Sequence, residues 1–502
     1  MRASIFLAAG AATILSGPAV AMQASQTYDL VIRGGRVIDP ASGRDEIAEI
    51  GISGRSVAAI STAPLKGRRT IDAKGLVVAP GFVDLHAHGQ HDKGQYYQVL
   101  DGVTTAIDAE SGAFPIAPFH AALAPQALIN FGATASHRCA RMLVLTGSQC
   151  GGHPAINEDP AIDYDALNRA ATPEEEARIV AALDAEVAAG ALGYGLGIEY
   201  TPGAGRREIY EIFKSAAAHQ APVFVHVRSR PIDQAPGVPI AVAQEVIANA
   251  AATGAPTQLV HLHSTGLGDT PVIAELVKGA AARGIDITTE AYPYTAGSTM
   301  IGSQFFREGW QERSSIDYGD LQWAATGERL TKERFDALRA NEPNGNVIVH
   351  MIPEAVVDAV IMDPDISIAS DGMAWKTSGE HPRGAGTFAR VLGRFVRDRR
   401  SPDLATAIAK MTIMPARRME KISPQMAKKG RLAVGSDADI TIFDPATIID
   451  RATFDRPMQP SVGIRHVFVN GQQVVANGKM VDRVYPGEAI RSSLSPQSTT
   501  RP

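Results

Sequence analysis

Apolar and polar positions follow two different periods along this chain. Near its start, YDLVIRGGRVIDP and EIAEIGISGRSVAAI alternate apolar and polar residues, with Gly or Asp-Pro between the runs. The same texture returns near the other end in DADITIFDP and GIRHVFVNGQQVVANGK. Alternation bounded by such turns is typical of antiparallel strands with one buried face. We therefore expect the two ends, residues 27–75 and 426–485, to form the halves of one small β-sandwich.

The middle of the chain has another pattern, in which short apolar runs alternate with Ala-rich stretches of helical period. The clearest helix is TPEEEARIVAALDAEVAAG, where Thr172 and Glu175 have the spacing of a capping box. Eight runs have strand length: VVAPGFVDLHAH, GVTTAIDAE, RMLVLTG, ALGYGLG, PVFVHV, TQLVHLH, DITTEAYPY and ISIASD. Strands alternating with helices indicate βα units, and eight of them fit a (β/α)8 barrel. We predict this α/β barrel over residues 76–425.

Three segments depart from these patterns. Residues from about 300 to 345 interrupt the barrel before its eighth strand, as lids and binding loops commonly do. The tail, residues 486–502, is polar and is predicted to be disordered. Residues 1–21 combine Arg2, an apolar stretch and an Ala-Val-Ala end, which is the pattern of a cleaved secretory signal. We expect export, to a bacterial periplasm.

Composition and charge narrow the classes of function. The 502 residues are 45% hydrophobic, enough for a sizeable core and more than one domain. A net charge of −5 and a pI near 6.2 argue against nucleic acid as a partner. Beyond the signal, we find no segment with the apolar length of a membrane span. Cys139 and Cys150 could pair in an oxidising compartment or stay free, and they lack the C-x-x-C spacing of a metal site.

Side chains that bind metals stand at the ends of five of the predicted strands. His86 and His88 follow VVAPGFVDL one residue apart, so both imidazoles share a face of the strand. The other four strands end in Glu110, His226, His261 and Asp371. Each alone could cap a helix or lie in the core, but the carboxyl ends of barrel strands meet on one rim. Because unpaired buried acids are costly there, the set predicts a metal site.

The donor set of this site, imidazole nitrogen with carboxylate oxygen, suits Zn²⁺, with Mn²⁺, Co²⁺ or Fe²⁺ as competitors. Glu110 could bridge two ions, one held by the His86–His88 pair and one by the other two histidines. Asp371 would act as general base toward a water acidified by the metal, and then protonate the leaving amine. The sequence leaves open whether one ion or two are bound.

Longer motifs give the chain a family resemblance. H-x-H on strand one, His on strands five and six and Asp on strand eight resemble the amidohydrolase superfamily pattern. The strand-four, strand-seven and strand-eight regions are similar to its N-acyl-D-amino-acid deacylase (D-aminoacylase) branch, in the motifs GALGYGLGIEYTPG, AYPYTAGST, and SDGM followed by HPRGAGTFARVLGRFVRD. The branch's C-terminal run is matched by MTIMPARRM, KGRLAVGSDADITIFDPATI and VNGQQVVANG. The resemblance covers nearly all of the chain after the signal, and it implies a metal-dependent hydrolase of linear amides.

Two positions depart from the family pattern. Many members carry a metal-binding Cys after strand two, where this chain has DAESG; Glu110 resembles the ligand of the glutamate-bearing members, with Asp108 as a rival. Two positions after the strand-six histidine, members often have a Lys that holds the substrate's α-carboxylate, and this chain has His263. Histidine is a weaker anion anchor at neutral pH, so substrate affinity would depend on its protonation.

Four further residues are candidates for binding the substrate. Tyr200 and Tyr292 match motif positions that face substrate in the family. Arg228 leaves strand five on the same face as the metal-binding histidine, and arginine binds carboxylate bidentately. Arg383, after strand eight, binds substrate or orders its own loop.

The sequence therefore predicts a hydrolase that cleaves the amide of a small N-acyl-D-amino acid. A dipeptidase or cyclic amidase of the same superfamily is one alternative, although cyclic-amide members often use a carboxylated Lys as the bridge and no Lys ends a predicted strand here. A non-catalytic exported metal-binding protein is the other, and it would be expected to lack Asp371. The side chain and acyl group accepted, and the oligomeric state, stay open.

Overall fold

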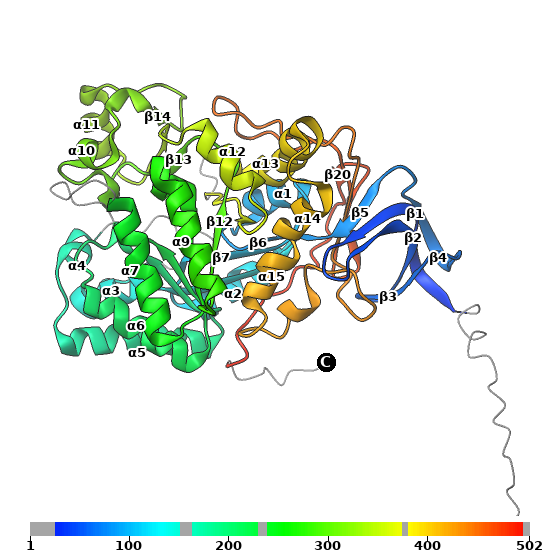
Figure 1. The fold of residues 1–502 in the computed structure, drawn as a ribbon, viewed down its shortest axis with the longest axis horizontal. Helices are drawn as coiled ribbons and strands as arrows, with labels where there is room; N and C mark the ends of the chain where they lie inside the picture. The colour runs from blue at the N-terminus through cyan, green and yellow to red at the C-terminus, as the bar shows by residue number, and fades with distance from the viewer. Residues whose placement is uncertain (1–25, 151–162, 229–237, 374–379, 495–502) are drawn as a thin grey trace, which may run out of the picture.

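The protein folds into a barrel, a sheet made from both chain ends, and a small sheet above the barrel (Figure 1). The structure is a computed structural model that describes residues 26–150, 163–228, 238–373 and 380–494. The predicted signal, residues 1–21, lies outside these ranges. The barrel and its helices occupy the left and centre of Figure 1, and strands β1 (Thr27–Asp39) and β2 (Arg44–Ser53) lie at the right.

Eight parallel strands form the barrel, which confirms the predicted fold class. In chain order they are β6 (Phe82–Asp84), β7 (Val103–Ala113), β8 (Asn130–Ser136), β9 (Tyr194–Gly197), β10 (Val223–His226), β11 (Thr257–Leu259), β12 (Ile287–Ala291) and β16 (Ser367–Ile368). Neighbours in this order are hydrogen-bonded, and a bridge between Ala87 and Gly372 brings the first and last strands together. All eight carboxyl ends therefore meet on one rim.

Helices surround the barrel. They are α1 (Asp92–Leu100), α2 (Ile116–Leu123), α3 (His137–Thr146), α4 (Tyr164–Asn168), α5 (Pro173–Ala189), α6 (Arg206–His219), α7 (Val238–Thr253), α8 (Leu262–Gly266), α9 (Thr270–Ala282), α12 (Glu354–Met362), α13 (Arg383–Arg390), α14 (Leu404–Met411) and α15 (Ile413–Met419). The capping box predicted for α5 is present: Thr172 Oγ1 accepts from the Glu175 backbone N–H at 3.3 Å, and the Glu175 carboxylate accepts from the Thr172 N–H at 2.8 Å.

The third barrel strand is not the one predicted. RMLVLTG, residues 141–147, lies in helix α3 and the turn that ends it, and the strand is the preceding NFGATAS of β8. Every residue of β8 is buried, and a Cβ on Gly132 would meet Leu192 and Ile107 at about 3 Å. The close neighbours require a glycine at position 132, and the strand lacks the β-branched run by which strands are recognised.

The two chain ends join in one nine-stranded sheet, as expected of ends that form one small β-domain. Besides β1 and β2, its strands are β3 (Ser56–Ser61), β4 (Lys66–Asp72), β5 (Val77–Pro80), β17 (Ile440–Phe443), β18 (Ile464–Val469), β19 (Gln472–Ala476) and β20 (Lys479–Met480). The ends meet where β5 pairs with both β1 and β17. The run VVAPGFVDLHAH is thus divided: β5 belongs to this sheet, and β6 begins the barrel.

The predicted insertion forms a small layer with its own core. Strands β13 (Gly297–Met300), β15 (Asn346–Val349) and β14 (Leu321–Trp323) pair in that order, and helices α10 (Trp310–Ser314) and α11 (Lys332–Asn341) pack beside them. Buried aromatic side chains, among them Phe306, Trp310 and Phe335, fill the space between. The insertion is therefore a folded cap on the barrel, at the upper left of Figure 1.

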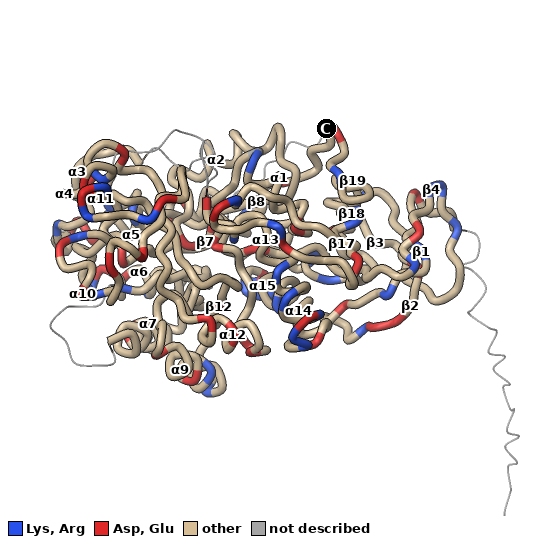
Figure 2. Tube along the Cα trace, turned by 90° about the horizontal axis from the view of Figure 1, so that it is seen from above, with Lys and Arg blue, Asp and Glu red and all other residues tan. Residues whose placement is uncertain are grey.

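The tail is ordered further than predicted. Ile490 is fully buried, and its N–H donates to the carbonyl of Phe131 in β8 at 2.7 Å. Residues 486–494 thus pack against the barrel, and 495–502 lie outside the described residues. Figure 2 shows acidic and basic positions interspersed over both the barrel and the end sheet. In the part of the chain that the structure describes, no helix is long and apolar enough to cross a bilayer.

Cys139 and Cys150 form a disulfide that closes a short loop between α3 and the segment after it. A cross-link with a sequence separation of 11 residues removes loop entropy from the unfolded chain. We expect the double substitution Cys139→Ala/Cys150→Ala to lower the free energy of unfolding by about 2–3 kcal/mol, measured by urea denaturation. Reducing agent should destabilise the wild-type protein by a similar amount and leave the double variant unchanged. Equal stability of the two proteins would contradict a disulfide in solution.

Candidate metal and active site

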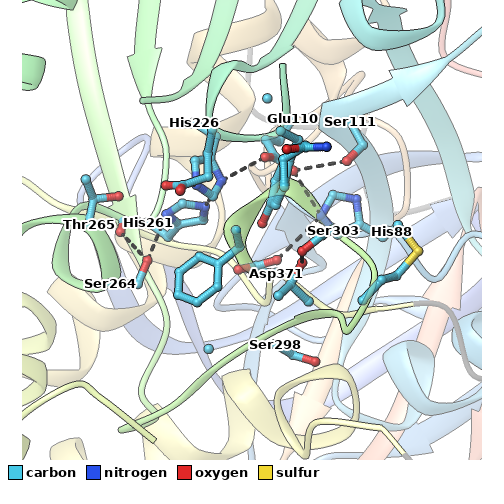
Figure 3. A pocket seen from close by; sticks show the side chains of 18 of the residues that line it. His88, Glu110, Ser111, His226, His261, Ser264, Thr265, Ser298, Ser303 and Asp371 are labelled. Carbon is cyan, nitrogen blue, oxygen red and sulfur yellow. Dashed lines mark hydrogen bonds and ion pairs between the residues drawn. The ribbon is translucent and has the colours of Figure 1, made fainter. Parts of the chain in front are cut away.

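The barrel rim brings together all six side chains that were predicted to bind metal. Their positions follow directly from the strands: His86 and His88 come just after β6, and His226 is the last residue of β10. Figure 3 shows the carboxylate of Glu110 between His226 and His88, with Asp371 beside His88. All six are buried or nearly so, and most lie on the wall of one pocket.

Glu110 is the centre of this arrangement. Its Oε1 lies 3.0 Å from His226 Nδ1, and its Oε2 lies 3.3 Å from His88 Nε2 and 3.5 Å from His86 Nε2. His261 Nε2 lies 3.1 Å from His226 Nδ1. The two oxygens of one carboxylate therefore face two different pairs of histidines, as a bridging ligand requires.

Asp371 closes the other side of the site. Its Oδ1 lies 3.4 Å from the Nε2 atoms of both His86 and His88, and its Oδ2 forms an ion pair with Arg383 Nη1 at 2.9 Å. Asp371 and His261 both have a positive φ, of 50° and 29°. Such backbone costs about 1–3 kcal/mol in a non-glycine residue, and it is found mainly where a functional side chain must be aimed.

Donor atoms in the site fall into groups that fit a metal ion. Within each of three overlapping groups, the ligand atoms lie within 4.8 Å of one another: His86, His88 and Glu110; Glu110, His226 and His261; and His86, His261 and Asp371. Buried imidazole nitrogens and carboxylate oxygens are the donors that zinc and its neighbours prefer. The first two groups share only Glu110, so the residues can hold two ions through one bridge.

A second layer of carboxylates orients the histidines. Glu290, in β12, accepts from His86 Nδ1 at 2.5 Å and is itself bonded by Gln258. Asp108 lies 3.1 Å from His88 Nδ1, behind the ring and opposite the nitrogen that faces Glu110. Asp108, which the sequence offered as an alternative metal ligand to Glu110, is therefore placed to orient the ring of His88. Glu290 was not predicted from the sequence, although an acid inside the apolar strand run DITTEAYPY was the available signal.

We expect Glu290→Gln to weaken metal binding about 10–100-fold, because the amide can no longer accept a charge-assisted bond that holds His86 in place. Competition with a chromogenic chelator measures this affinity. Glu275→Gln is the matched control, since Glu275 is exposed on α9. Equal affinity in the Glu290 variant and the wild-type protein would exclude this orienting role.

The electrostatics of the histidines reflect the acids around them. Burial lowers the pKa of His86, but the charges of Asp371 and Glu290 outweigh it and raise the pKa to about 10. Burial lowers the pKa of His261 well below its usual value, and the charge of His226 lowers it further. Without a metal, the site thus takes up protons at some of the nitrogens that a metal would occupy, so the two compete.

The carboxylates of the site stay ionised in spite of their burial. Burial raises the pKa of Glu110, but hydrogen bonds from three histidines more than offset it, and the pKa lies well below its usual value. Burial also raises the pKa of Asp371, and the charges of Arg383 and His86 reverse that effect and lower it. At neutral pH both groups are therefore available as anionic ligands, and Asp371 can accept a proton.

Three of the five predicted substrate contacts lie on the pocket wall in usable positions. Tyr200, Tyr292 and Arg383 all line the pocket. Arg383 is 1% exposed, and its guanidinium lies over the ring of Tyr292 at 4.7 Å, while one nitrogen reaches Asp371. This guanidinium is held from two sides at the edge of the metal site.

The other two predicted contacts need correction. Arg228 lines the pocket, but its donors are taken by the carboxylate of Glu245 at 3.1 Å and by the carbonyl of Ala204 at 2.7 Å. His263 is 0% exposed, packs against Tyr292 with ring centroids 4.3 Å apart, and does not reach the pocket surface. Burial lowers the pKa of His263 to about 3. The burial of His263 therefore argues against the expected protonation-dependent carboxylate anchor at this residue.

One wall of the pocket comes from the insertion, whose individual pocket residues were not predicted from the sequence. The insertion contributes Met300, Phe305 and Trp310 to it, facing the barrel rim. Their only signal in the sequence was the aromatic content of an otherwise irregular segment. The insertion thus roofs the metal site with apolar side chains, as expected of a segment that covers a substrate.

Comparisons with known proteins agree with this site. A model of the amidohydrolase family matches residues 113–475. The N-acyl-D-glutamate deacylase of Alcaligenes xylosoxydans xylosoxydans is 32% identical over 499 residues, covering 94% of this chain and 98% of that protein. The structure of an N-acyl-D-glutamate deacylase from Bordetella bronchiseptica, complexed with zinc and a phosphonate mimic of the tetrahedral intermediate, superposes with a TM-score of 0.74 at 28% identity, covering 93% of this chain and 100% of that one.

A D-aminoacylase studied for its binuclear metal centre superposes with a TM-score of 0.75 at 25% identity, covering 92% of this chain and 100% of that one. The family model and the deacylase both extend over most of the chain, and both agree with the motifs on its strands. The chain belongs to the amidohydrolase family, in its N-acyl-D-amino-acid deacylase (D-aminoacylase) branch.

Proposed function

We propose that this protein is a metal-dependent hydrolase that cleaves the amide bond of N-acyl-D-amino acids. The observation that carries the proposal is the position of Glu110, whose two oxygens face two pairs of histidines, with the ionised Asp371 beside one pair. The names of the relatives support the substrate class. The zinc complex of one relative supports zinc as the ion.

We assign the metal to residues of this chain as follows. His86, His88 and Glu110 would hold one ion, and Glu110, His226 and His261 a second. When bound, the metal supplies Lewis-acid chemistry that polarises the amide carbonyl and makes a water more acidic. Glu290 and Asp108 keep the rings of His86 and His88 turned toward it.

Asp371 carries the proton. Its carboxylate is ionised and buried, so it can take a proton from the attacking water and then deliver it to the nitrogen of the leaving amine. Arg383 holds Oδ2 of Asp371 and leaves Oδ1 toward the histidines. The arginine thereby fixes which oxygen faces the reacting atoms.

The α-carboxylate of the substrate has a binding place beside Asp371. Arg383 and Tyr292 both line the pocket there, and the buried guanidinium can form charge-assisted hydrogen bonds to a carboxylate. Since Arg228 is engaged with Glu245 and His263 is buried, neither is part of this proposal.

A linear amide fits the site better than a cyclic one of the superfamily. The bridging position belongs to Glu110, and none of the described residues that line the pocket is a lysine that could be carboxylated. A non-catalytic binding protein does not account for Asp371, whose backbone is held at a positive φ against the metal-binding histidines. Hydrolysis is therefore the function we propose.

The experiment is an assay of the zinc-loaded enzyme on N-acetyl-D-amino acids of different side chains, with the L-enantiomers as controls. We expect hydrolysis of D-substrates, loss of activity in chelator, and recovery when Zn²⁺ is restored. Release of amino acid from N-acetyl-L-substrates alone, or activity only on cyclic amides, would contradict the proposal.

We also propose that the protein acts outside the cytoplasm, in a bacterial periplasm. The pattern of residues 1–21 supports export, and a disulfide such as Cys139–Cys150 persists in an oxidising compartment. Fractionation of cells that express the full chain, with and without residues 1–21, tests this. Equal recovery of both forms in the cytoplasm would contradict export.

A further inference from the structure

Arg138 is a pocket arginine whose charge is not matched by an acid. It follows β8 in the first turn of α3, and its guanidinium lines the pocket. Among the residues that the structure describes, its one polar contact is to Cys150 Sγ at 4.0 Å. Burial lowers the pKa of Arg138, and the more distant charge of Glu110 offsets this only in part.

The other arginines of the pocket are already engaged. Arg383 pairs with Asp371, and Arg228 pairs with Glu245. Arg313 donates to two backbone carbonyls of its own segment. Arg138 is half-buried on the pocket wall and, unlike these three, has no protein oxygen as a partner among the described residues, so an anion that enters the pocket can pair with it.

The backbone around Arg138 favours an anion as that partner. Helix α3 has 10 residues, and its first residues stand at the rim, where Ser136, Arg138 and Cys139 all line the pocket. Ser136 is the N-cap residue, and its side chain caps no backbone N–H. The positive end of the helix dipole and the guanidinium therefore face the same space.

The position of Arg138 indicates which part of a substrate it would meet. In barrel order β8 is the third strand and β12 the seventh, so the two stand opposite each other on the ring. Tyr292 directly follows β12, and with Arg383 it forms the proposed place for the α-carboxylate. The metal-binding residues lie between the two sides. A substrate that has its amino-acid half at Arg383 extends its acyl half toward Arg138.

We infer that Arg138 binds a carboxylate on the acyl group, so that the preferred substrates are D-amino acids acylated by a dicarboxylic acid. This inference rests on the proposed function for the orientation of the substrate. An arginine pairs with a carboxylate in a bidentate manner, and the apolar Leu167 nearby would contact the methylene groups of such an acyl chain.

The test compares N-succinyl-D-alanine with its neutral succinamoyl analogue. We expect the wild-type enzyme to favour the acid by about 10–100-fold in kcat/KM, as for a hydrogen bond to a charged group. Arg138→Met should remove most of this preference, and Arg138→Lys should retain part of it. Arg178→Met is the matched control, because Arg178 is exposed on α5, and it should keep the full preference.

A second comparison separates the two halves of the substrate. N-acetyl-D-glutamate and N-acetyl-D-glutamine differ in charge on the side chain instead of the acyl group. If Arg138→Met changes only this second preference, Arg138 reads the side chain and the inference is overturned. Equal rates of the wild-type enzyme on succinyl and succinamoyl substrates would also overturn it.

Binding measured without turnover distinguishes this inference from the proposed function. Calorimetry on the Asp371→Asn variant, loaded with Zn²⁺, gives the affinities for the succinyl and succinamoyl compounds. If this variant prefers the acid in a manner that depends on Arg138, and the wild-type enzyme hydrolyses no D-substrate, the proposed function is refuted and the anion site is supported. Hydrolysis of D-substrates with no such preference in binding would refute the anion site alone.

Discussion

Asp371→Asn is expected to lower kcat by about 10²–10⁴-fold while the protein keeps its fold and its metal. The amide has nearly the shape of the carboxylate but cannot accept a proton from water or return one to the amine. Asp371 Oδ1 stands 3.4 Å from two histidine nitrogens, so the loss falls on the atoms that surround the reacting centre. Most of the zinc should stay, because Glu110 and the histidines supply the other ligands.

Steady-state kinetics on an N-acetyl-D-amino acid, with zinc content from the same preparation, measures this expectation. Asp365→Asn is the control, since Asp365 is 67% exposed and far from the pocket wall. Asp371→Asn also leaves Arg383 without its anionic partner, so thermal unfolding of this variant is needed to show that the fold survives. A variant with full zinc and near wild-type kcat would remove Asp371 from proton transfer.

Glu110→Gln is expected to have the second large effect, a loss of bound zinc together with a fall in kcat/KM of more than about 100-fold. Its two oxygens lie within 3.0–3.5 Å of three histidine nitrogens, so one substitution weakens both candidate ion positions. A neutral amide also fails to balance the charge of two divalent ions. Metal analysis after dialysis and kinetics at saturating zinc separate lost affinity from lost chemistry.

Asp108→Asn is the matched control for the bridging role. Asp108 contacts the far nitrogen of the His88 ring, so its loss should loosen one ligand and reduce metal affinity only about 10–100-fold. The test is which of the two variants, Glu110→Gln or Asp108→Asn, loses more zinc affinity. Zinc lost from Asp108→Asn but kept by Glu110→Gln would assign the bridge to the rival residue.

The metal-binding set could be read from the sequence because its signals are local. Each of His86, Glu110 and His226 ends or closely follows an apolar strand run, and parallel strands of a barrel end on one rim whatever their side chains are. The capping box of α5 was visible for the same reason, since Thr172 and Glu175 satisfy each other within one turn.

Other features depended on neighbours that are distant in the chain, and only the tertiary structure decided them. Strand β8 has a glycine at position 132 because Leu192 and Ile107 leave no room for a side chain there, and its sequence lacks the β-branched pattern of a strand. His263 was expected at the substrate and is instead buried behind Tyr292, while Arg138 was not singled out and faces the pocket without an acid.

The sequence by itself thus determined the barrel, the joining of the two ends, the family and the candidate metal ligands that the fold brings to one rim. The tertiary structure decided which oxygen faces which nitrogen, which arginines are already paired, and that Glu290 orients His86 across 204 positions of sequence. The physical reason is the distance along the chain between the residues that interact. Strand and helix periods, and the ends they produce, are set by residues within a few positions of one another, whereas burial and the pairing of charges depend on contacts between separate elements.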